Sequence, residues 1–314
     1  MNRTVVRPRL GVGLLLAGLA LGACSSSSSS KRSSTSSGTG RVVEVDQLPQ
    51  SHRDLLRAYG AGGDAWESAR AQALDDPALT RFLVENLFLE LVRAHRSLGG
   101  DDSERALRAR DRARVELARM GAPAAPTLAA ALEVADDVAA ELAAQTLGAI
   151  GRPALPALLE VLAAPQPNAR QRAALALARM PHGAREEPRV RDALVRASAD
   201  AEWFVRAQAA RALGARGVRD VETAPWRIAL EKLLSDRDEA VVEAAAGALT
   251  ELADPQAIGA LIAALNEATN EAELRKFRAL QHALERLSGV GPQPSIAAWR
   301  AWWRDNRARL ERGE

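Results

Sequence analysis

A stretch of twelve residues occurs twice in this chain, thirty residues apart, and it constrains the fold more than any other feature. Residues 121–132 and 151–162 carry Gly, Pro, Ala, Pro, Leu and Leu at identical offsets. Self-similarity with a period of 20–50 residues is typical of stacked structural units. Glycine ends helices in a left-handed conformation, and proline suits the first turn of the next helix. The stretch therefore predicts a helical hairpin that is repeated along the chain.

A second pattern, V-R-x-x-A-A-x-A-L-G, extends the repeat, and its clearest copy is residues 205–214. Its leucines recur at spacings of 30, 30, 36 and 36 residues, at Leu117, Leu147, Leu177, Leu213 and Leu249. Paired small residues lie just before four of these leucines, at Ala143-Ala144, Ala173-Ala174, Ala209-Ala210 and Ala245-Ala246. Small side chains at a contact shorten the distance between helix axes. We therefore expect the leucines to be buried between closely packed helices.

The arginine of the V-R step is not kept in every copy. It is present as Arg110, Arg170 and Arg206, but Ala140 and Val242 take its place elsewhere. A position that is shared with alanine and valine favours a solvated or stacking side chain over a catalytic one.

These patterns resemble the HEAT-like repeats first recognised in phycobilisome lyases, over residues 103–265 and more loosely on either side. The resemblance implies an all-α fold, a right-handed α-solenoid of HEAT-like helical hairpins with a C-terminal capping helix. The repeat is shared far beyond those lyases, so it does not favour phycobilin ligation. A composition with 47% hydrophobic but only 4% aromatic residues agrees with helix packing.

The N-terminus has the features of an export signal. Three arginines precede an apolar run of about fourteen residues, which is shorter than the ~20 that a spanning helix needs. The run ends in Leu21-Gly22-Ala23-Cys24, which resembles the lipobox of bacterial lipoproteins. That resemblance implies cleavage before Cys24 and acylation of its sulfur. The alternative is an ordinary secretory signal that happens to contain a cysteine.

The expected organisation has five parts: a lipoprotein signal peptide (1–23), a Ser-rich lipidated tether (24–46), N-terminal helices (47–102), HEAT-like repeats (103–265), and C-terminal helices with a Trp-rich cap (266–314). The tether is of low complexity and predicts a flexible leash. Residue 25 is Ser, not the Asp that tends to retain lipoproteins at the inner membrane, which favours the outer membrane.

The net charge of the chain without its signal peptide is close to zero. It has 39 basic and 40 acidic side chains, so the charge does not indicate nucleic-acid binding.

The last helix carries three tryptophans on one face, at Trp299, Trp302 and Trp303. One interpretation is a cap, because the final unit of a solenoid needs a cover for its apolar end. The other is an exposed aromatic site for a partner, since tryptophan is enriched at such sites. The terminal position and the preceding Gly/Pro loop at residues 291–294 favour the cap.

The chain lacks the usual sequence signatures of catalysis. Its four histidines do not have zinc-ligand spacing, and Cys24 is its one cysteine, so we predict no metal and no cofactor. Residues 236–239, which are rich in acids, fit a helix N-terminus better than a calcium loop. The basic run between Arg105 and Arg114 is interleaved with acids and predicts a solvated helix face.

The sequence therefore predicts a membrane-tethered scaffold or adaptor, not an enzyme, that binds a protein partner in the bacterial cell envelope. The alternative is an accessory or regulatory subunit of an envelope enzyme or assembly machine. We expect the membrane contact to be made through the lipid on Cys24, and we infer neither a small-molecule substrate nor nucleic acid.

Overall fold

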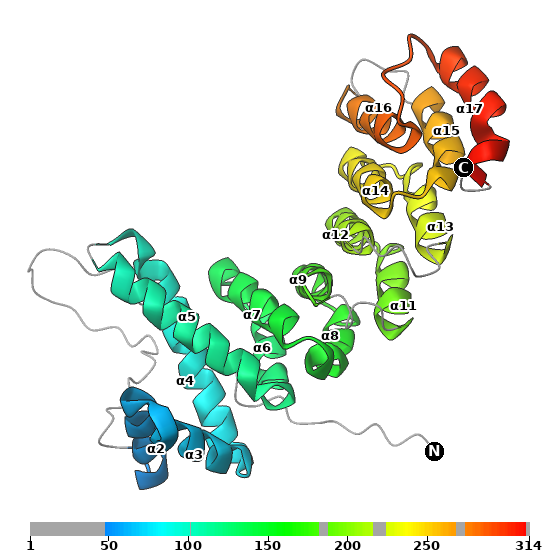
Figure 1. Ribbon diagram of the computed structural model, residues 1–314. Helices are drawn as coiled ribbons and strands as arrows, with labels where there is room; N and C mark the ends of the chain where they lie inside the picture. The colour runs from blue at the N-terminus through cyan, green and yellow to red at the C-terminus, as the bar shows by residue number, and fades with distance from the viewer. Residues whose placement is uncertain (1–47, 101, 182–187, 216–223, 268–273, 312–314) are drawn as a thin grey trace, which may run out of the picture. The chain divides into compact units, whose positions relative to one another are not determined.

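A computed structural model of the chain describes residues 48–100, 102–181, 188–215, 224–267 and 274–311. These residues form fifteen α-helices and short 3-10 turns, and no strand occurs among them. The chain divides into two compact units, residues 1–146 and 147–314 (Figure 1). The all-α solenoid fold is as the repeat pattern predicts.

The N-terminal unit is built around the long helix α4 (Pro77–Arg96), which packs along α5 (Ser103–Met120). The helices α2 (Gln50–Ala61) and α3 (Gly63–Leu74) lie against one end of α4, and the short α6 (Ala125–Ala131) also contacts it (Figure 1). The Asp76 carboxylate accepts hydrogen bonds from the N–H groups of Ala78 and Leu79 and so fixes the start of α4. The helix α7 (Asp137–Ile150) spans the boundary between the two units.

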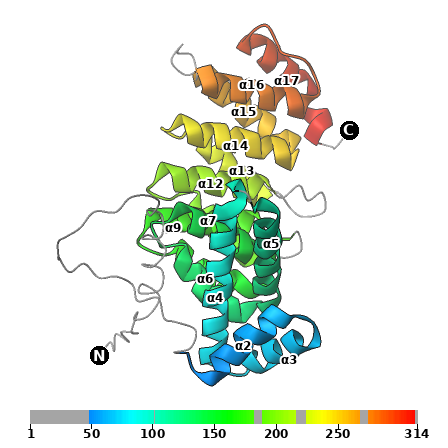
Figure 2. The same ribbon diagram turned by 90° about the vertical axis from the view of Figure 1, so that its left-hand side faces the viewer.

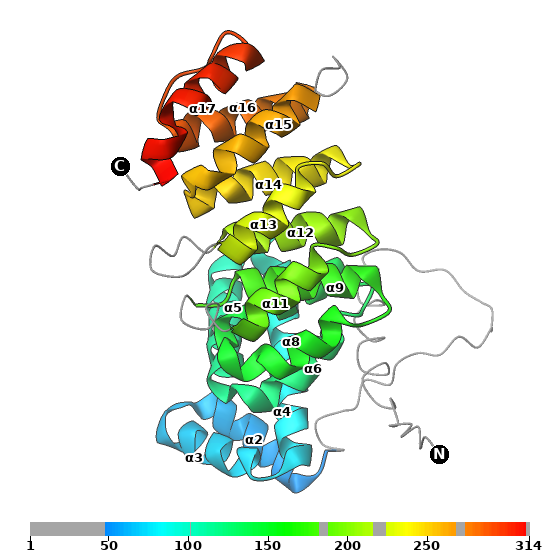
Figure 3. The ribbon, with the colours of Figure 1, turned by 90° about the vertical axis from the view of Figure 1, so that its right-hand side faces the viewer.

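The C-terminal unit consists of helices in two rows (Figures 2 and 3). We call α9 (Pro167–Ala178), α12 (Trp203–Gly214), α14 (Glu239–Leu252) and α16 (Leu274–Ser288) the first row, in which each helix packs on the next. The second row contains α8 (Leu155–Leu162), α11 (Pro188–Ala197), α13 (Ala224–Leu233) and α15 (Ile258–Glu267). The last helix, α17 (Ile296–Glu311), packs on α15.

The duplicated stretch forms the same turn twice. Gly121 and Gly151 have φ of +63° and +74° with ψ near −130°, a conformation that side chains with a Cβ rarely adopt. A 3-10 turn that contains the first proline follows each glycine, and the second proline lies in the first turn of α6 or α8. The glycine therefore ends one helix and the prolines start the next, as predicted.

The repeated leucines and alanines form the core. All five leucines, from Leu117 to Leu249, and all four alanine pairs are completely buried. Gly214, the residue after one of these leucines, lies so close to α14 that an added Cβ would be 2.4 Å from the Ala248 Cα. Gly148 is in the same position of its repeat and is similarly close to Arg179. These close approaches explain why the pattern ends in Leu-Gly.

The interpretation of the V-R arginine as a solvated or stacking side chain was wrong for two copies. Arg170 binds the Asp200 carboxylate through two nitrogens at 2.7 and 2.8 Å, and Arg206 binds Asp236 at the same two distances. Arg206 is only 7% exposed and also donates to two backbone carbonyls of the preceding loop. Each arginine therefore ties its helix to the loop one unit further along, a long-range contact that alignment of the arginine position alone does not reveal.

The tryptophan face of α17 packs inward, as the cap interpretation predicts. Trp299 is 1% exposed, and its ring lies 6.1 Å from that of Trp302 in an edge-to-face arrangement. The Trp303 indole covers Gly259 of α15, where an added Cβ would lie 3.2 Å from the indole nitrogen. The final helix therefore covers apolar surface on α15.

Candidate functional site

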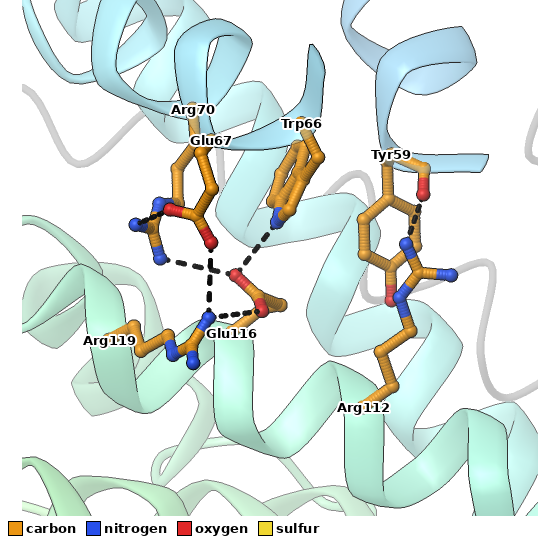
Figure 4. Close-up of polar contacts among 7 residues, drawn as sticks. All are labelled: Tyr59, Trp66, Glu67, Arg70, Arg112, Glu116 and Arg119. Atoms are coloured by element: carbon orange, nitrogen blue, oxygen red, sulfur yellow. Dashed lines mark hydrogen bonds and ion pairs between the residues drawn. The ribbon is translucent and has the colours of Figure 1, made fainter. Parts of the chain in front are cut away.

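The N-terminal unit contains a cluster of charged and aromatic side chains from α2, α3 and α5, which surrounds a buried carboxylate (Figure 4). Its centre is Glu116, which is 6% exposed and lies one residue before the repeated Leu117. The other repeats have Thr or Ala at this position: Thr146, Ala176, Ala212 and Ala248. A carboxylate at a position that otherwise carries a small residue requires partners, because an unpaired buried charge is costly.

Three donors converge on the Glu116 carboxylate (Figure 4). The Trp66 indole N–H lies 2.9 Å from Oε2, an Arg70 nitrogen lies 3.3 Å from the same oxygen, and an Arg119 nitrogen lies 3.3 Å from Oε1. Glu67 pairs with both Arg70 and Arg119 and so closes the network. The cluster holds α3 against α5 through charge-assisted hydrogen bonds.

A second contact attaches α2 to the same helix. The Arg112 guanidinium lies over the Tyr59 ring, 4.1 Å from its centroid, and donates to the Tyr59 carbonyl oxygen (Figure 4). The Tyr59 ring meets Trp66 edge-to-face at 5.0 Å, which links this contact to the Glu116 cluster. The arrangement combines a cation–π interaction with an aromatic pair.

Burial dominates the electrostatics beside this cluster. Burial and the nearby Glu90 carboxyl raise the pKa of the Tyr59 hydroxyl above its ordinary value, against the opposite effect of Arg112. Burial likewise raises the pKa of Glu90, which is on α4, against the opposite effects of Tyr59 and Arg112. Both groups are therefore held toward their neutral forms.

The cluster is suited to holding helices together and not to proton transfer. Both oxygens of Glu116 already accept hydrogen bonds, and Glu67 is paired with two arginines. Sequence reasoning missed this cluster, although the acid at residue 116 departs from the repeat pattern and was a usable signal.

The basic run on α5 is largely a solvated face, as predicted. Arg105 pairs with Asp102 and Arg108 pairs with Glu104, and these two arginine side chains are 82% and 69% exposed. Arg110 and Arg114 both pair with Asp111 on the same helix. Arg112 is the exception, because it lies on Tyr59.

An open pocket of about 470 Å³ lies in the N-terminal unit, where the α3–α4 turn meets the start of α6. Three prolines, two threonines and a leucine line it, and Arg81 is its one titratable side chain: Leu74, Pro77, Thr80, Arg81, Pro123, Pro126 and Thr127. In the part of the chain that the structure describes, no group of three or more His, Cys, Asp or Glu side chains is placed to bind a metal.

The first row of the C-terminal unit carries an exposed tryptophan. Trp203, the first residue of α12, is 46% exposed, and its ring meets that of Phe204 edge-to-face at 5.7 Å. Ile228, on α13 in the second row, is equally exposed at 46%. Sequence reasoning placed the partner-binding tryptophan on α17 as its alternative and overlooked Trp203.

The lipid-attachment residue, Cys24, lies outside the described residues, as do the whole signal sequence and the tether down to residue 46. Among the helices that the structure describes, none combines the length and the apolar character that a membrane span requires.

The fold defines an α-solenoid that is built from helical repeats. The HEAT-repeat profile matches residues 124–214 and 196–285, which together span 124–285 and so cover just over half of the 314 residues. The chain belongs to the HEAT-repeat family.

Known structures with similar folds are repeat proteins and engineered proteins. An engineered protein is 24% identical, with a TM-score of 0.41 over 64% of this chain and 99% of its own. A designed armadillo repeat protein in complex with a (KR)4 peptide is 21% identical, with a TM-score of 0.38 over 62% of this chain and 99% of its own. The karyopherin Kap121p bound to the SUMO protease Ulp1p is 16% identical, with a TM-score of 0.48 over 85% of this chain and 32% of its own. No curated protein matches the chain.

Proposed function

We propose that this protein is a lipid-anchored HEAT-repeat scaffold that binds a protein partner in the bacterial cell envelope. The observation that carries the binding role is Trp203, a large aromatic side chain that is almost half exposed on the first row. Tryptophan is enriched among the residues that dominate binding energy at protein interfaces. Solenoid rows offer extended surfaces, which suit macromolecular partners.

The Glu116 cluster and the pocket beside Arg81 support a scaffold role over a catalytic one. The Glu116 cluster is saturated by its own neighbours, and the pocket beside Arg81 contains one titratable side chain. Trp203, by contrast, has exposed apolar surface whose burial against a partner would be favourable.

The anchor is supported by the sequence. An apolar run that ends in Leu21-Gly22-Ala23-Cys24 is followed by a serine-rich segment, the arrangement expected of a lipidated cysteine on a flexible tether. Two or three acyl chains hold a protein at a membrane far more firmly than one. The scaffold would face the periplasm or the cell exterior, with the outer membrane favoured by Ser25.

The anchor is tested by replacing Cys24 with Ser and fractionating cells. We expect the native chain in the membrane fraction with a lipid-modified N-terminus, and the variant either soluble or retained as an uncleaved precursor. A mature native chain that is soluble and carries an unmodified cysteine would contradict the anchor.

The binding role is tested by crosslinking in intact cells, followed by detergent purification and identification of the captured proteins. Trp203→Ala should abolish capture of a specific partner, whereas Ile228→Ala should leave it unchanged. Ile228 is the matched control because it is equally exposed but lies on the second row. Equal capture by the two variants would exclude Trp203 as the binding site, and the identity of the partner would distinguish an adaptor from a subunit of an envelope enzyme.

A further inference from the structure

Two neighbouring helices of the first row carry exposed stripes of opposite charge. On α14, Glu243 and Glu251 are exposed, and residues 239–252 contain no lysine or arginine. On α16, Arg278 and Arg286 are exposed on one face together with His282. Residues 243, 247 and 251 are spaced by four, as are 278, 282 and 286, so each set follows one face of its helix.

The two stripes are in register. The repeated Leu249 of α14 corresponds to Leu284 of α16, and both are completely buried. The same offset of 35 residues relates 243 to 278, 247 to 282, and 251 to 286. Since α14 and α16 pack side by side and bury equivalent leucines, equivalent positions lie level with each other on one surface.

The middle position of each stripe is also complementary in size. Gly247 is exposed, and a Cβ added there would meet no atom within 4 Å, so the surface has open space at that point. His282, at the equivalent position of α16, is an exposed side chain of larger size. Each stripe therefore consists of two charged side chains on either side of a central residue. The charges are negative on α14 and positive on α16, and the central residue is small on α14 and large on α16.

The four charged groups are not neutralised by their own chain. Within the described residues, Glu243, Glu251, Arg278 and Arg286 take part in no ion pair, whereas the arginines of α5 pair with acids on their own helix.

A two-fold axis makes this surface complementary to itself. If the axis lies between α14 and α16 and runs parallel to them, it places α14 of one copy over α16 of the other without changing the height along the helices. Glu243 then faces Arg278 of the second copy, Glu251 faces Arg286 of the second copy, and Gly247 faces His282 of the second copy. We propose that α14 and α16 form a homotypic docking surface that binds a second copy of this chain.

Two other uses of the stripes are less well matched. An acidic segment of a different protein would pair with α16 alone and leave the glutamates of α14 unmatched. Pairing of α14 with α16 inside one copy would neutralise both stripes, but among the described residues no ion pair joins Glu243 or Glu251 to Arg278 or Arg286. A second copy engages both stripes at once. Interfacial charges contribute more to orientation and specificity than to affinity, so the contact is weak and sensitive to salt.

The test uses charge reversal and analytical ultracentrifugation. Every sample is the full chain as the cell processes it, in nonionic detergent and with Cys24→Ser, so that acyl chains do not cause association. One variant is E243R/E251R, which makes the whole surface positive, and another is R278E/R286E, which makes it negative. A third variant combines all four substitutions and restores both signs in exchanged positions. R300E/R304E on α17 is the control, because it reverses two exposed arginines outside the surface.

We expect the chain without charge substitutions to dimerise at low ionic strength. It should dissociate in about 1 M salt, where the Debye length falls to about 3 Å. Each two-residue variant alone should associate about a hundredfold more weakly or less, because like charges then face each other. An equimolar mixture of the positive and negative variants should form a heterodimer, and the four-residue variant should dimerise again. The α17 control should behave as the native chain.

A native chain that stays monomeric at low ionic strength would overturn the proposal. Failure of the mixture to form a heterodimer would also overturn it. Equal association of all variants would do the same, because the contact would then lie on another surface. Variants that change the melting temperature but not the sedimentation would show that the stripes pair within one copy. These results do not depend on Trp203, so they are independent of the partner-binding test.

Discussion

The close contact between α12 and α14 at Gly214 predicts a large effect from a single methyl group. A Cβ added at Gly214 would lie 2.4 Å from the Ala248 Cα and 2.5 Å from its Cβ. The nearest of these atoms belongs to the backbone of α14, so a side-chain rotation does not relieve the overlap, and the two helices must separate. Overpacking of this kind costs about 1–3 kcal/mol. The gain in helix propensity from Gly to Ala is at most about 1 kcal/mol and is smaller at the last residue of a helix. Gly214→Ala should therefore destabilise the protein by roughly 1–3 kcal/mol.

The neighbouring helix provides a matched control with the opposite expected sign. Gly247 lies in the interior of α14 and is exposed, and a Cβ there would contact nothing within 4 Å. Gly247→Ala keeps the gain in helix propensity without the overlap, so it should stabilise the protein by about 0.5–1 kcal/mol.

The assay is thermal and urea unfolding of both variants and the parent at low protein concentration, followed by far-ultraviolet circular dichroism. A change of 1 kcal/mol shifts the melting temperature of a unit of this size by about 2–4 °C. Gly214→Ala should melt below the parent and Gly247→Ala above it. If Gly214→Ala is as stable as Gly247→Ala, the two helices are not as close at this point as the structure places them.

Three further predictions concern the ion pairs and the cap. Arg206→Met should destabilise the protein by roughly 3 kcal/mol, because it leaves the half-buried Asp236 carboxylate without its arginine partner. A double-mutant cycle with Asp236→Asn should show strong coupling in urea unfolding. Burial acts to raise the pKa of Asp200 and Asp236, but hydrogen bonds from Arg170 and Arg206 and from backbone N–H groups outweigh it, so both pKa values are lowered. The stability that these carboxylates confer is complete above about pH 4, near the unfolded pKa, and is lost as the pH falls below it, so replacing both by Asn should flatten the acid limb of a plot of stability against pH. Removal of residues 291–314 should lower the melting temperature and promote aggregation, and an equally stable truncated chain would contradict the capping role of Trp299.

The sequence predicted the repeating parts of the fold because their signals are local. A glycine that needs a positive φ, prolines in the first turn, and leucines at a helical period each report on the few residues around them. Gly121, Gly151 and the buried leucines therefore lie where the pattern places them. The inward tryptophan face of α17 followed from the same reasoning, since a row of apolar side chains at the end of a repeat array requires a covered surface.

The sequence was less informative where one residue meets another that is distant in the chain. The repeat pattern predicts a solvated or stacking side chain at Arg170 and Arg206, because alanine and valine occupy the same position in other repeats. The partners of these two arginines, Asp200 and Asp236, lie thirty residues further along, and that separation becomes a contact only when one unit stacks on the next.

Sequence alone therefore determined the class of fold, the length of the repeat and the residues of its core, because helix periodicity and turn conformation depend on residues within one repeat. Tertiary structure alone decided how the charged groups are used. It gathered Trp66, Arg70 and Arg119 around Glu116, left Trp203 exposed, and packed α14, with its exposed glutamates, beside α16, with its exposed arginines. The physical reason is that a charge has the same periodicity whether it faces solvent, a neighbouring helix or a partner, and only packing distinguishes these environments.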